Sequence, residues 1–163
     1  MRYYDISNGL NKNKKERIFI LSGEHPRELI AVETAYNFVQ DLLLNQSKYE
    51  RILNHYDIRI IVNSNPYGRI NVERGEYCRR VNLNNVDINR NWDIYWGAKI
   101  QLQEEYPGSS PFSEVETKFT KYLVETFKPK VFLTIHSGVY GLYMPYAFEM
   151  KEGKNLLIFS KYQ

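Results

Sequence analysis

The sequence predicts an α/β fold with a mainly parallel or mixed sheet that is flanked by helices. Short apolar segments alternate with segments of helical periodicity along the 163 residues, which is the pattern of parallel strands joined by crossover helices. Polar clusters follow three of the apolar segments, at the strand ends where ligands gather in such sheets. The hydrophobic fraction of 43% suffices for one buried core.

The first half of the chain predicts a strand, a helix and a second strand. An apolar run over 17–21 ends at a Ser-Gly pair and predicts a buried strand. Apolar residues then recur at helical spacing from Leu29 to Leu43, which predicts an amphipathic helix of about 16 residues. A second strand is predicted over 57–62, and the segment 65–68, Asn-Pro-Tyr-Gly, is typical of a turn.

The second half predicts a long loop, a helix and a third strand. The stretch 69–108 is polar and irregular, and a loop of this length inside a domain is usually functional. A helix is predicted from Ser113 to about residue 127, with Ser113 as N-cap and Glu116 completing a capping box. Pro129 ends that helix, and 131–135 is predicted to be a strand.

Composition and charge exclude several classes of function. The net charge is only +3, and the densest basic run, 12–17, contains Glu16, so we interpret it as a solvated turn and expect no nucleic-acid partner. The single cysteine, Cys78, excludes a disulfide framework and a cysteine-rich metal site. We find neither a secretory signal nor an apolar run of about 20 residues. We therefore expect no membrane association, with a cytoplasmic location as the default for an unknown compartment.

Two of the three histidines lie where a metal site is expected. His25 and His136 each follow an apolar strand, and His25 and Glu28 are three residues apart in a loop that turns into a helix. That spacing puts both side chains on one side of the turn. Two histidines and one glutamate with an open fourth position form a catalytic zinc site, although a hydrogen-bonded structural histidine is the alternative for each. His55 is interpreted as a surface or packing residue.

Four motifs in order resemble those of the zinc metallocarboxypeptidase family of the carboxypeptidase A/B type. They are Gly23-Glu24-His25-Pro26-Arg27-Glu28, Asn65-Pro66-Tyr67-Gly68, Val86-Asp87-Ile88-Asn89-Arg90-Asn91-Trp92 and Ile135-His136-Ser137-Gly138. The segments 107–114 and 142–146 are similar in sequence to a plant and protist branch of that family. The resemblance extends from about residue 17 to about residue 146.

The resemblance implies a metal site and the domain that carries it. His25, Glu28 and His136 match the ligands of one Zn²⁺. The family's full domain is longer, so residues 1–163 are expected to form a single incomplete metallocarboxypeptidase-like domain.

It also implies how a substrate is held. Asn89 and Arg90 match the pair that grips the terminal carboxylate of a peptide, and a guanidinium suits such a bidentate contact. Arg79 is the best match for the arginine that polarises the scissile carbonyl, with Arg80 close behind and a solvated loop pair as the alternative. Arg27 matches a second arginine that contacts substrate.

The implied function is that of a zinc-dependent exopeptidase that removes C-terminal amino acids from peptides or proteins with metal-activated water. In the family the general-base glutamate comes from a later segment, and no stretch after Tyr146 resembles it. Glu149 and Glu152 are interpreted as residues of an exposed turn. Three alternatives therefore remain: a non-catalytic remnant that serves as a zinc- or C-terminus-binding or assembly subunit, with a protein partner covering the incomplete domain; a fragment of a longer enzyme; and a related metal-dependent deacylase, against which Asn89 and Arg90 favour a carboxylate-bearing peptide substrate.

Overall fold

The molecule is built on a four-stranded mixed sheet. The computed structural model describes residues 1–10, 15–97 and 102–144. The strands are β1 (Tyr3–Ile6), β2 (Glu16–Ser22), β3 (Tyr56–Ile61) and β4 (Val131–Ile135), in the order β1-β3-β2-β4. Strand β2 runs parallel to both β3 and β4, whereas β1 is antiparallel to β3. The predicted α/β class with a mainly parallel or mixed sheet is thereby confirmed.

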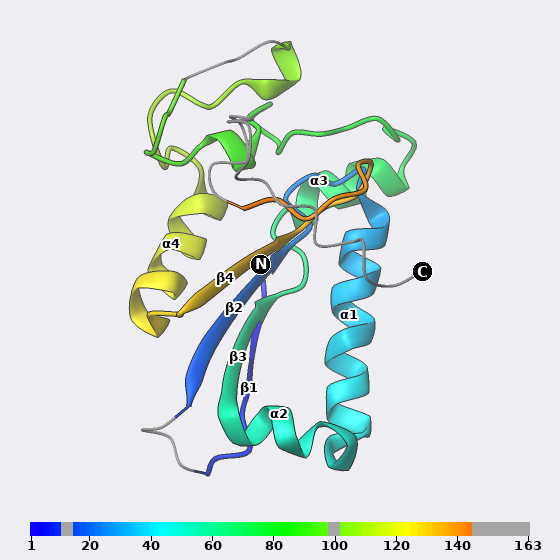
Figure 1. Ribbon diagram of the computed structural model, residues 1–163. Helices are drawn as coiled ribbons and strands as arrows, with labels where there is room; N and C mark the ends of the chain where they lie inside the picture. Colours follow the sequence, from blue (N-terminus) through cyan, green and yellow to red (C-terminus); the bar gives the residue numbers. More distant parts are fainter. Residues whose placement is uncertain (11–14, 98–101, 145–163) are drawn as a thin grey trace.

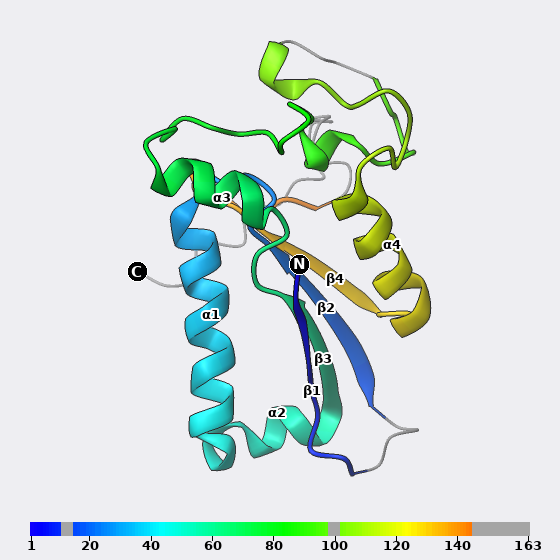
Figure 2. The ribbon, with the colours of Figure 1, turned by 180° about the vertical axis from the view of Figure 1, so that it is seen from behind.

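Helices cover both faces of this sheet. The helices are α1 (Leu29–Leu44), α2 (Glu50–His55), α3 (Pro66–Glu73) and α4 (Val115–Phe127), and single 3₁₀ turns lie at Gln46–Tyr49, Ile88–Arg90 and Gln103–Glu105. Helix α1 lies on one face and α4 on the other, while α3 and the long loop lie beyond the carboxyl ends of β2 and β4 (Figures 1 and 2). None of the helices in the described ranges is long and apolar enough to span a bilayer.

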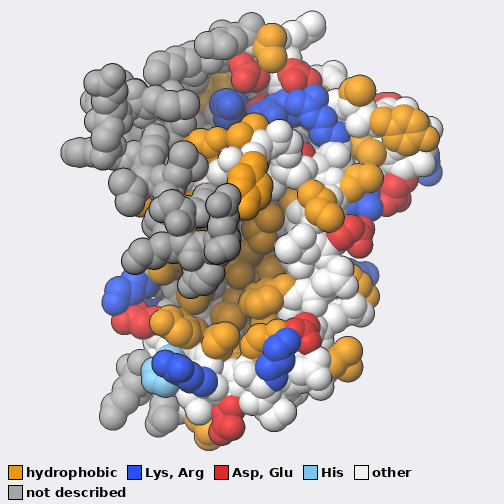
Figure 3. All heavy atoms as spheres, turned by 45° about the vertical axis from the view of Figure 1, so that its right-hand side comes forward, with side chains coloured by type: hydrophobic (Ala, Val, Ile, Leu, Met, Phe, Trp, Pro, Cys, Tyr) orange, Lys and Arg blue, Asp and Glu red, His pale blue; other side chains and the backbone are white. Residues whose placement is uncertain are grey.

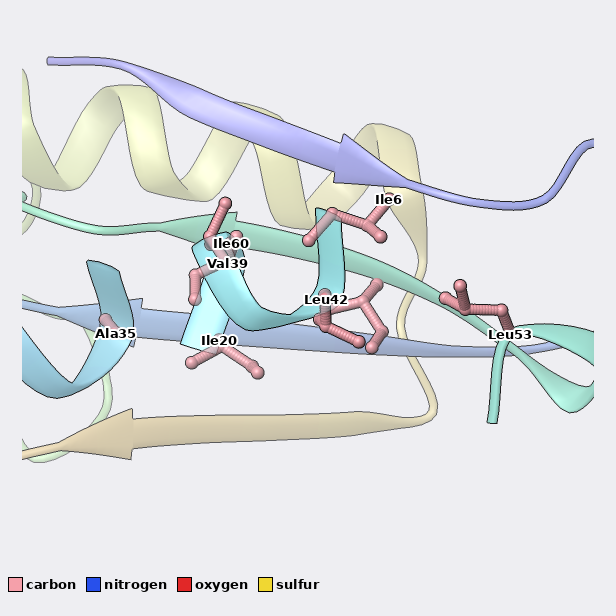
Figure 4. Close-up of a cluster of buried hydrophobic side chains, with 8 residues drawn as sticks. Ile6, Ile20, Ala35, Val39, Leu42, Leu53 and Ile60 are labelled. Atoms are coloured by element: carbon pink, nitrogen blue, oxygen red, sulfur yellow. The ribbon is translucent and has the colours of Figure 1, made fainter. Parts of the chain in front are cut away.

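The core on the α1 side explains why this helix forms where its periodicity predicts. Ala35, Val39 and Leu42 recur on one side of α1 and are buried against Ile20 and Ile60 of the sheet (Figure 4). Side chains alternate between the two faces of a strand, so every second residue of β2 and β3 points to this helix. Each such large apolar side chain stabilises the fold by about 1.5–3 kcal/mol when it is fully buried.

The alternate strand residues form a second, smaller core under α4. Phe19, Leu21 and Ile61 are buried there with Leu123 of α4. The ring of Phe132 on β4 stacks on Phe19, with 5.4 Å between the centroids and 7° between the planes. The sheet is therefore the middle of three layers, and the loops at its carboxyl end are held by rigid elements on both sides.

The structure differs from the sequence prediction at several boundaries. Strand β1 and helix α2 were not predicted. The 65–68 segment is not only a turn, because α3 begins at Pro66, and the side chain of Asn65 accepts a hydrogen bond from the backbone N–H of Gly68 at 3.0 Å. The predicted capping box of α4 is wrong: Glu114 is the N-cap, and no side chain caps the helix. Ser113 instead donates to the carboxylate of Glu114 at 2.7 Å.

Candidate metal centre

The pairing of β2 with β4 brings two histidines together. The two strands are parallel neighbours, and Ser22 at the end of β2 lies opposite Ile135 at the end of β4. His25 follows β2 after two further residues, and His136 follows β4 directly. Their ring centroids are 4.9 Å apart, so one small ion between them lies within reach of both imidazoles.

Glu28 completes the group from the start of α1. One carboxylate oxygen is 2.7 Å from Nδ1 of His25, and the other is 3.0 Å from Nδ1 of His136. One donor atom from each of the three residues lies within 4.8 Å of the others. Two imidazole nitrogens and a carboxylate are a donor set that fits Zn²⁺, so the residues predicted from the sequence to be metal ligands form a group with suitable chemistry.

A buried aspartate supports His25 from the other side. Oδ1 of Asp87 is 3.1 Å from Nε2 of His25, and its other oxygen accepts from Nε and Nη2 of Arg80 at 2.9 and 2.8 Å. Asp87 is fully buried. A carboxylate on the outer nitrogen of a histidine fixes its tautomer and orientation, which leaves Nδ1 of His25 facing Glu28.

The electrostatics of the cluster favour charged carboxylates. Burial by itself would lower the pKa of His136, but hydrogen bonds to Glu24 and Glu28 raise this pKa to about 10. The pKa of His25 is also raised, because contacts with Asp87 and Glu28 outweigh its burial. The pKa of Glu28 falls well below its usual range, since hydrogen bonds from the two histidines outweigh its burial. A dense group of negative charges with imidazole partners is an environment that suits a cation.

The two candidate arginines for the carbonyl-polarising role lie differently. Arg79 binds away from the centre: its guanidinium donates to Glu76 at 2.7 Å and to the carbonyl of Asn82 at 2.5 Å. Arg80 has one guanidinium nitrogen 3.5 Å from Nδ1 of His25 and is paired with Asp87. The structure thus brings Arg80, and not Arg79, next to the metal-binding group.

The predicted carboxylate clamp lies beside Asp87. Asn89 and Arg90 belong to the 3₁₀ turn Ile88–Arg90, and the side chain of Asp87 accepts from the backbone N–H of Asn89 at 2.9 Å. The side chain of Arg90 is 38% exposed, and its guanidinium lies 3.8 Å from a carboxylate oxygen of Glu105. This loose contact leaves the guanidinium accessible to a ligand.

Arg27 is held by a partner on the long loop. Its guanidinium donates to both carboxylate oxygens of Glu104 at 3.0 and 3.1 Å, and to the carbonyl of Cys78 at 3.1 Å. A substrate that contacts Arg27 therefore has to compete with Glu104.

Sequence reasoning missed one residue of the centre and named others that the structure does not describe. Glu24 is 3% exposed, and its Oε2 lies 3.1 Å from Nε2 of His136. The one signal for it was its place directly before His25 in the first motif. Glu149, Glu152 and the end of the 142–146 motif lie outside the described residues.

Comparisons with known proteins show which family the chain belongs to. A family model described as zinc carboxypeptidase matches residues 1–161. The chain is 31% identical to carboxypeptidase O of Bos taurus over 172 aligned positions, which cover 95% of this chain and 46% of that protein. It is 30% identical to carboxypeptidase B of Astacus astacus over 138 positions, which cover 76% and 46% respectively.

A solved structure shows the same arrangement of elements. The crystal structure of carboxypeptidase A from Helicoverpa armigera superimposes with a TM-score of 0.75 at 25% identity, over 86% of this chain and 39% of that one. The chain spans about half the length of the curated relatives it matches. Because the family model matches almost every residue, the chain belongs to the zinc carboxypeptidase family.

Proposed function

We propose that this chain carries the zinc-binding and carboxylate-binding part of an exopeptidase that removes C-terminal amino acids from peptides or proteins. The observation that carries the proposal is the convergence of His25 and His136, from the ends of two neighbouring strands, with Glu28 at the start of α1. Membership of the zinc carboxypeptidase family supports the same reaction class.

The chain's own residues supply the holding and orienting parts of that reaction. His25, Glu28 and His136 would hold one Zn²⁺. When bound, a zinc ion supplies Lewis acidity, which lowers the pKa of water and polarises a carbonyl. Asp87 keeps Nε2 of His25 occupied and so keeps Nδ1 available as a donor to the metal. The buried position of His25 and Asp87 strengthens these contacts, because water does not compete for them.

The substrate's free carboxylate is assigned to Asn89 and Arg90. A guanidinium presents two parallel N–H donors that match the two oxygens of a carboxylate. The accessible guanidinium of Arg90 beside the metal-binding group supports this assignment. A peptide whose C-terminus is amidated lacks the negative charge, so the clamp would select for an unmodified chain end.

For the scissile carbonyl we favour Arg80 over Arg79. A carbonyl oxygen that gains negative charge is stabilised by a fixed positive group in a site that excludes water. Arg80 is oriented by Asp87 and lies 3.5 Å from a metal-binding imidazole. The guanidinium of Arg79 already donates to Glu76 and to a backbone carbonyl. These hydrogen bonds would have to break before Arg79 could stabilise the carbonyl oxygen of a substrate.

A second candidate function is binding of a C-terminus without hydrolysis. The contacts of the nearby carboxylates favour this function. In the described ranges, Glu24, Glu28 and Asp87 each contact a histidine. None of these three is therefore placed to take a proton from water, a role that usually contributes about 10²- to 10⁴-fold to the rate. In this function the chain would recognise a C-terminus and leave it intact.

The first experiment measures metal content. Protein dialysed against a zinc buffer and then analysed by mass spectrometry for metals should contain about one zinc ion per chain. The His25→Ala variant should contain none, because the remaining two ligands do not make a closed site. The matched control is His55→Ala, whose imidazole contacts only the carbonyl of Arg51 on α2 among the hydrogen bonds found. Wild-type protein without zinc would rule the proposal out.

The second experiment separates hydrolysis from binding. Calorimetry of the zinc-loaded chain with a short peptide should show weaker binding when the C-terminus is amidated, by about 10- to 100-fold for the loss of charge-assisted hydrogen bonds. Arg90→Ala should remove this preference, and Arg27→Ala should change it less. Release of the terminal amino acid, followed by chromatography, establishes the peptidase. In that case Arg80→Lys should slow the release more than Arg79→Lys.

A further inference from the structure

Glu24 is a buried carboxylate at the carboxyl end of β2 that the ligand group itself does not require. It is 3% exposed. Its backbone carbonyl accepts a hydrogen bond from Asn65 at 3.2 Å, and Gly23 before it has φ +72°, so the backbone at this point is held in a defined turn. A carboxylate is almost never buried to this extent unless it has partners.

Its partners lie at the end of β4. Oε2 of Glu24 is 2.5 Å from the hydroxyl of Thr134 and 3.1 Å from Nε2 of His136. The same hydroxyl is 2.9 Å from Nε2 of His136. The outer nitrogen of this histidine is therefore enclosed by Glu24 and Thr134, while its inner nitrogen, Nδ1, faces Glu28 at 3.0 Å.

We propose that Glu24 is a positioning residue for His136: its carboxylate accepts the hydroxyl proton of Thr134, which leaves the hydroxyl oxygen to accept from Nε2–H of His136, and so fixes the tautomer and ring orientation in which Nδ1 is the metal donor. The inference rests on the proposed zinc function. It makes the two histidines equivalent, because each imidazole has a buried carboxylate on its outer nitrogen, Asp87 for His25 and Glu24 for His136. Carboxylates in this position raise the donor strength of a ligating histidine.

The two supporting carboxylates differ in their other contacts. Asp87 shares its charge with Arg80. For Glu24, His136 is the one ion-pair partner found in the described ranges. With both imidazoles neutral, as metal ligands are, Glu24, Glu28 and Asp87 carry three negative charges beside the positive charge of Arg80, and a single divalent cation balances the remainder.

The first test is zinc affinity in competition with a chromogenic chelator. Glu24→Ala should weaken zinc binding by about 10- to 100-fold, and Glu24→Gln by less, because the amide oxygen still accepts from the Thr134 hydroxyl beside Nε2 of His136. The matched control is Glu125→Gln on α4, whose carboxylate is exposed and lies 3.8 Å from Lys121. This control should bind zinc as the wild type does.

The second test observes the histidine directly and does not depend on activity. The chain has three histidines, so isotope-labelled imidazoles give few NMR signals. In the zinc-loaded wild type, the Nε2–H proton of His136 should be shifted downfield and protected from exchange. Glu24→Gln should shift this signal upfield and leave that of His25 unchanged. Asp87→Asn should have the converse effect.

The possible failures are distinguishable. If the wild type binds no zinc, the proposed function fails and the role of Glu24 fails with it. If the wild type binds zinc, and both Glu24 variants keep its affinity and the His136 signal, only the positioning role is overturned. If Glu24→Ala does not fold, the affinity and the NMR signal of Glu24→Gln decide the question.

Discussion

At the scale of single residues, the site depends on contrasts between buried and exposed partners of the same chemical type. Asp87 is fully buried and bonds Arg80 through one oxygen and His25 through the other. The carboxylate of Glu104 makes a bidentate pair with Arg27 as well, but at the surface, where both side chains are about one-third exposed. Each pair joins a guanidinium to a carboxylate through two short contacts, so burial should account for a large part of the difference in their energies.

This contrast gives a prediction for stability. Asp87→Asn removes one partner of a buried pair and should lower the free energy of unfolding by about 2 kcal/mol or more. The same change of carboxylate to amide in Glu104→Gln should cost under about 1 kcal/mol. Urea denaturation in the presence of a chelator measures both without a contribution from metal. Equal losses would show that burial does not decide the strength of these pairs.

At the scale of elements, the long loop between α3 and α4 is held by specific backbone positions. Gly108 has φ +88° and lies so close to its neighbours that an added Cβ would be 2.4 Å from Oγ of Ser113 and 2.6 Å from Nδ2 of Asn91. The side chain of Asn91 in turn donates to the carbonyl of Pro107 at 2.7 Å. The loop that carries Asp87 is thus attached to the start of α4 at a crowded junction.

Gly108→Ala should therefore be costly. The combination of a strained φ and overpacking predicts a loss of about 2–4 kcal/mol. Gly75→Ala is the matched control, because Gly75 also has a positive φ but no atom within 4 Å of the added Cβ, so its cost should be about 1 kcal/mol. Thermal unfolding of the two variants would contradict the account if their midpoints fell equally.

The start of α4 also predicts a dependence of stability on pH. Burial alone would raise the pKa of Glu114, but hydrogen bonds from Ser113, Asn82 and Asn84 hold it below its ordinary value of 4.5. A pKa lowered by folding means that the charged carboxylate stabilises the folded state above pH 4.5, and that this contribution is lost as the pH falls through the lowered value.

The expected result is a difference that changes with pH. The gap in unfolding free energy between wild type and Glu114→Gln should be constant near neutral pH and should shrink in acid, below the ordinary pKa of the carboxyl group. Urea titrations at a series of pH values measure it, with Glu125→Gln as the exposed control. A gap that widens in acid would mean that folding raises the pKa of Glu114, and it would contradict the stabilising role given to the charged carboxylate.

Particular elements show what the sequence could and could not predict. Strands β2, β3 and β4 and helix α1 were predicted within about a residue of their ends, because continuous apolar runs and helical periodicity are strong signals. Strand β1 buries only Ile6, so its four residues carry no periodic pattern, and backbone pairing with β3 defines it. The sequence indicated a capping box at the start of α4. In the structure the hydroxyl of Ser113 instead accepts from Asn91 and donates to Glu114, so it does not cap the helix.

The residues of the candidate site also divide into those that the sequence predicts and those that only the folded structure reveals. The proximity of His25, Glu28 and His136 was predictable because the motifs fix which residues follow each strand. The role of Glu24 was not, because it depends on which residue of β4 lies beside the end of β2, and only the register of the sheet determines that. The sequence favoured Arg79, whereas the structure brings Arg80 next to His25, for a related reason: adjacent residues of an irregular loop point in different directions, and no periodicity assigns them.

At the scale of the whole molecule, the sheet has an apolar edge. In the described ranges no strand pairs with the outer side of β4, whose residues Val131, Phe132 and Leu133 are 42–44% exposed. On the face shown in Figure 3, hydrophobic side chains gather in a band through the middle, with charged side chains around its margins. An exposed apolar edge strand is a template for pairing with another chain.

We therefore expect the purified chain to associate in a concentration-dependent manner. Val131→Lys places a charge on the edge and should reduce the average mass found by sedimentation velocity. Val115→Lys, the same substitution at an exposed position of α4, should leave it unchanged. A wild-type chain that stays monomeric over the whole concentration series would show that the edge is not available for pairing.

The contact of Asp87 with both His25 and Arg80 has a thermodynamic consequence for the molecule. In the proposed function, the carboxylate is shared between an imidazole that would hold the metal and a guanidinium that would face the substrate. A ligand anion that draws Arg80 toward itself leaves more of the Asp87 charge to His25, and a cation held by His25 changes the charge that Arg80 experiences. The two occupancies are then linked by one coupling free energy, and linkage is reciprocal: the factor by which zinc strengthens anion binding equals the factor by which the anion strengthens zinc binding.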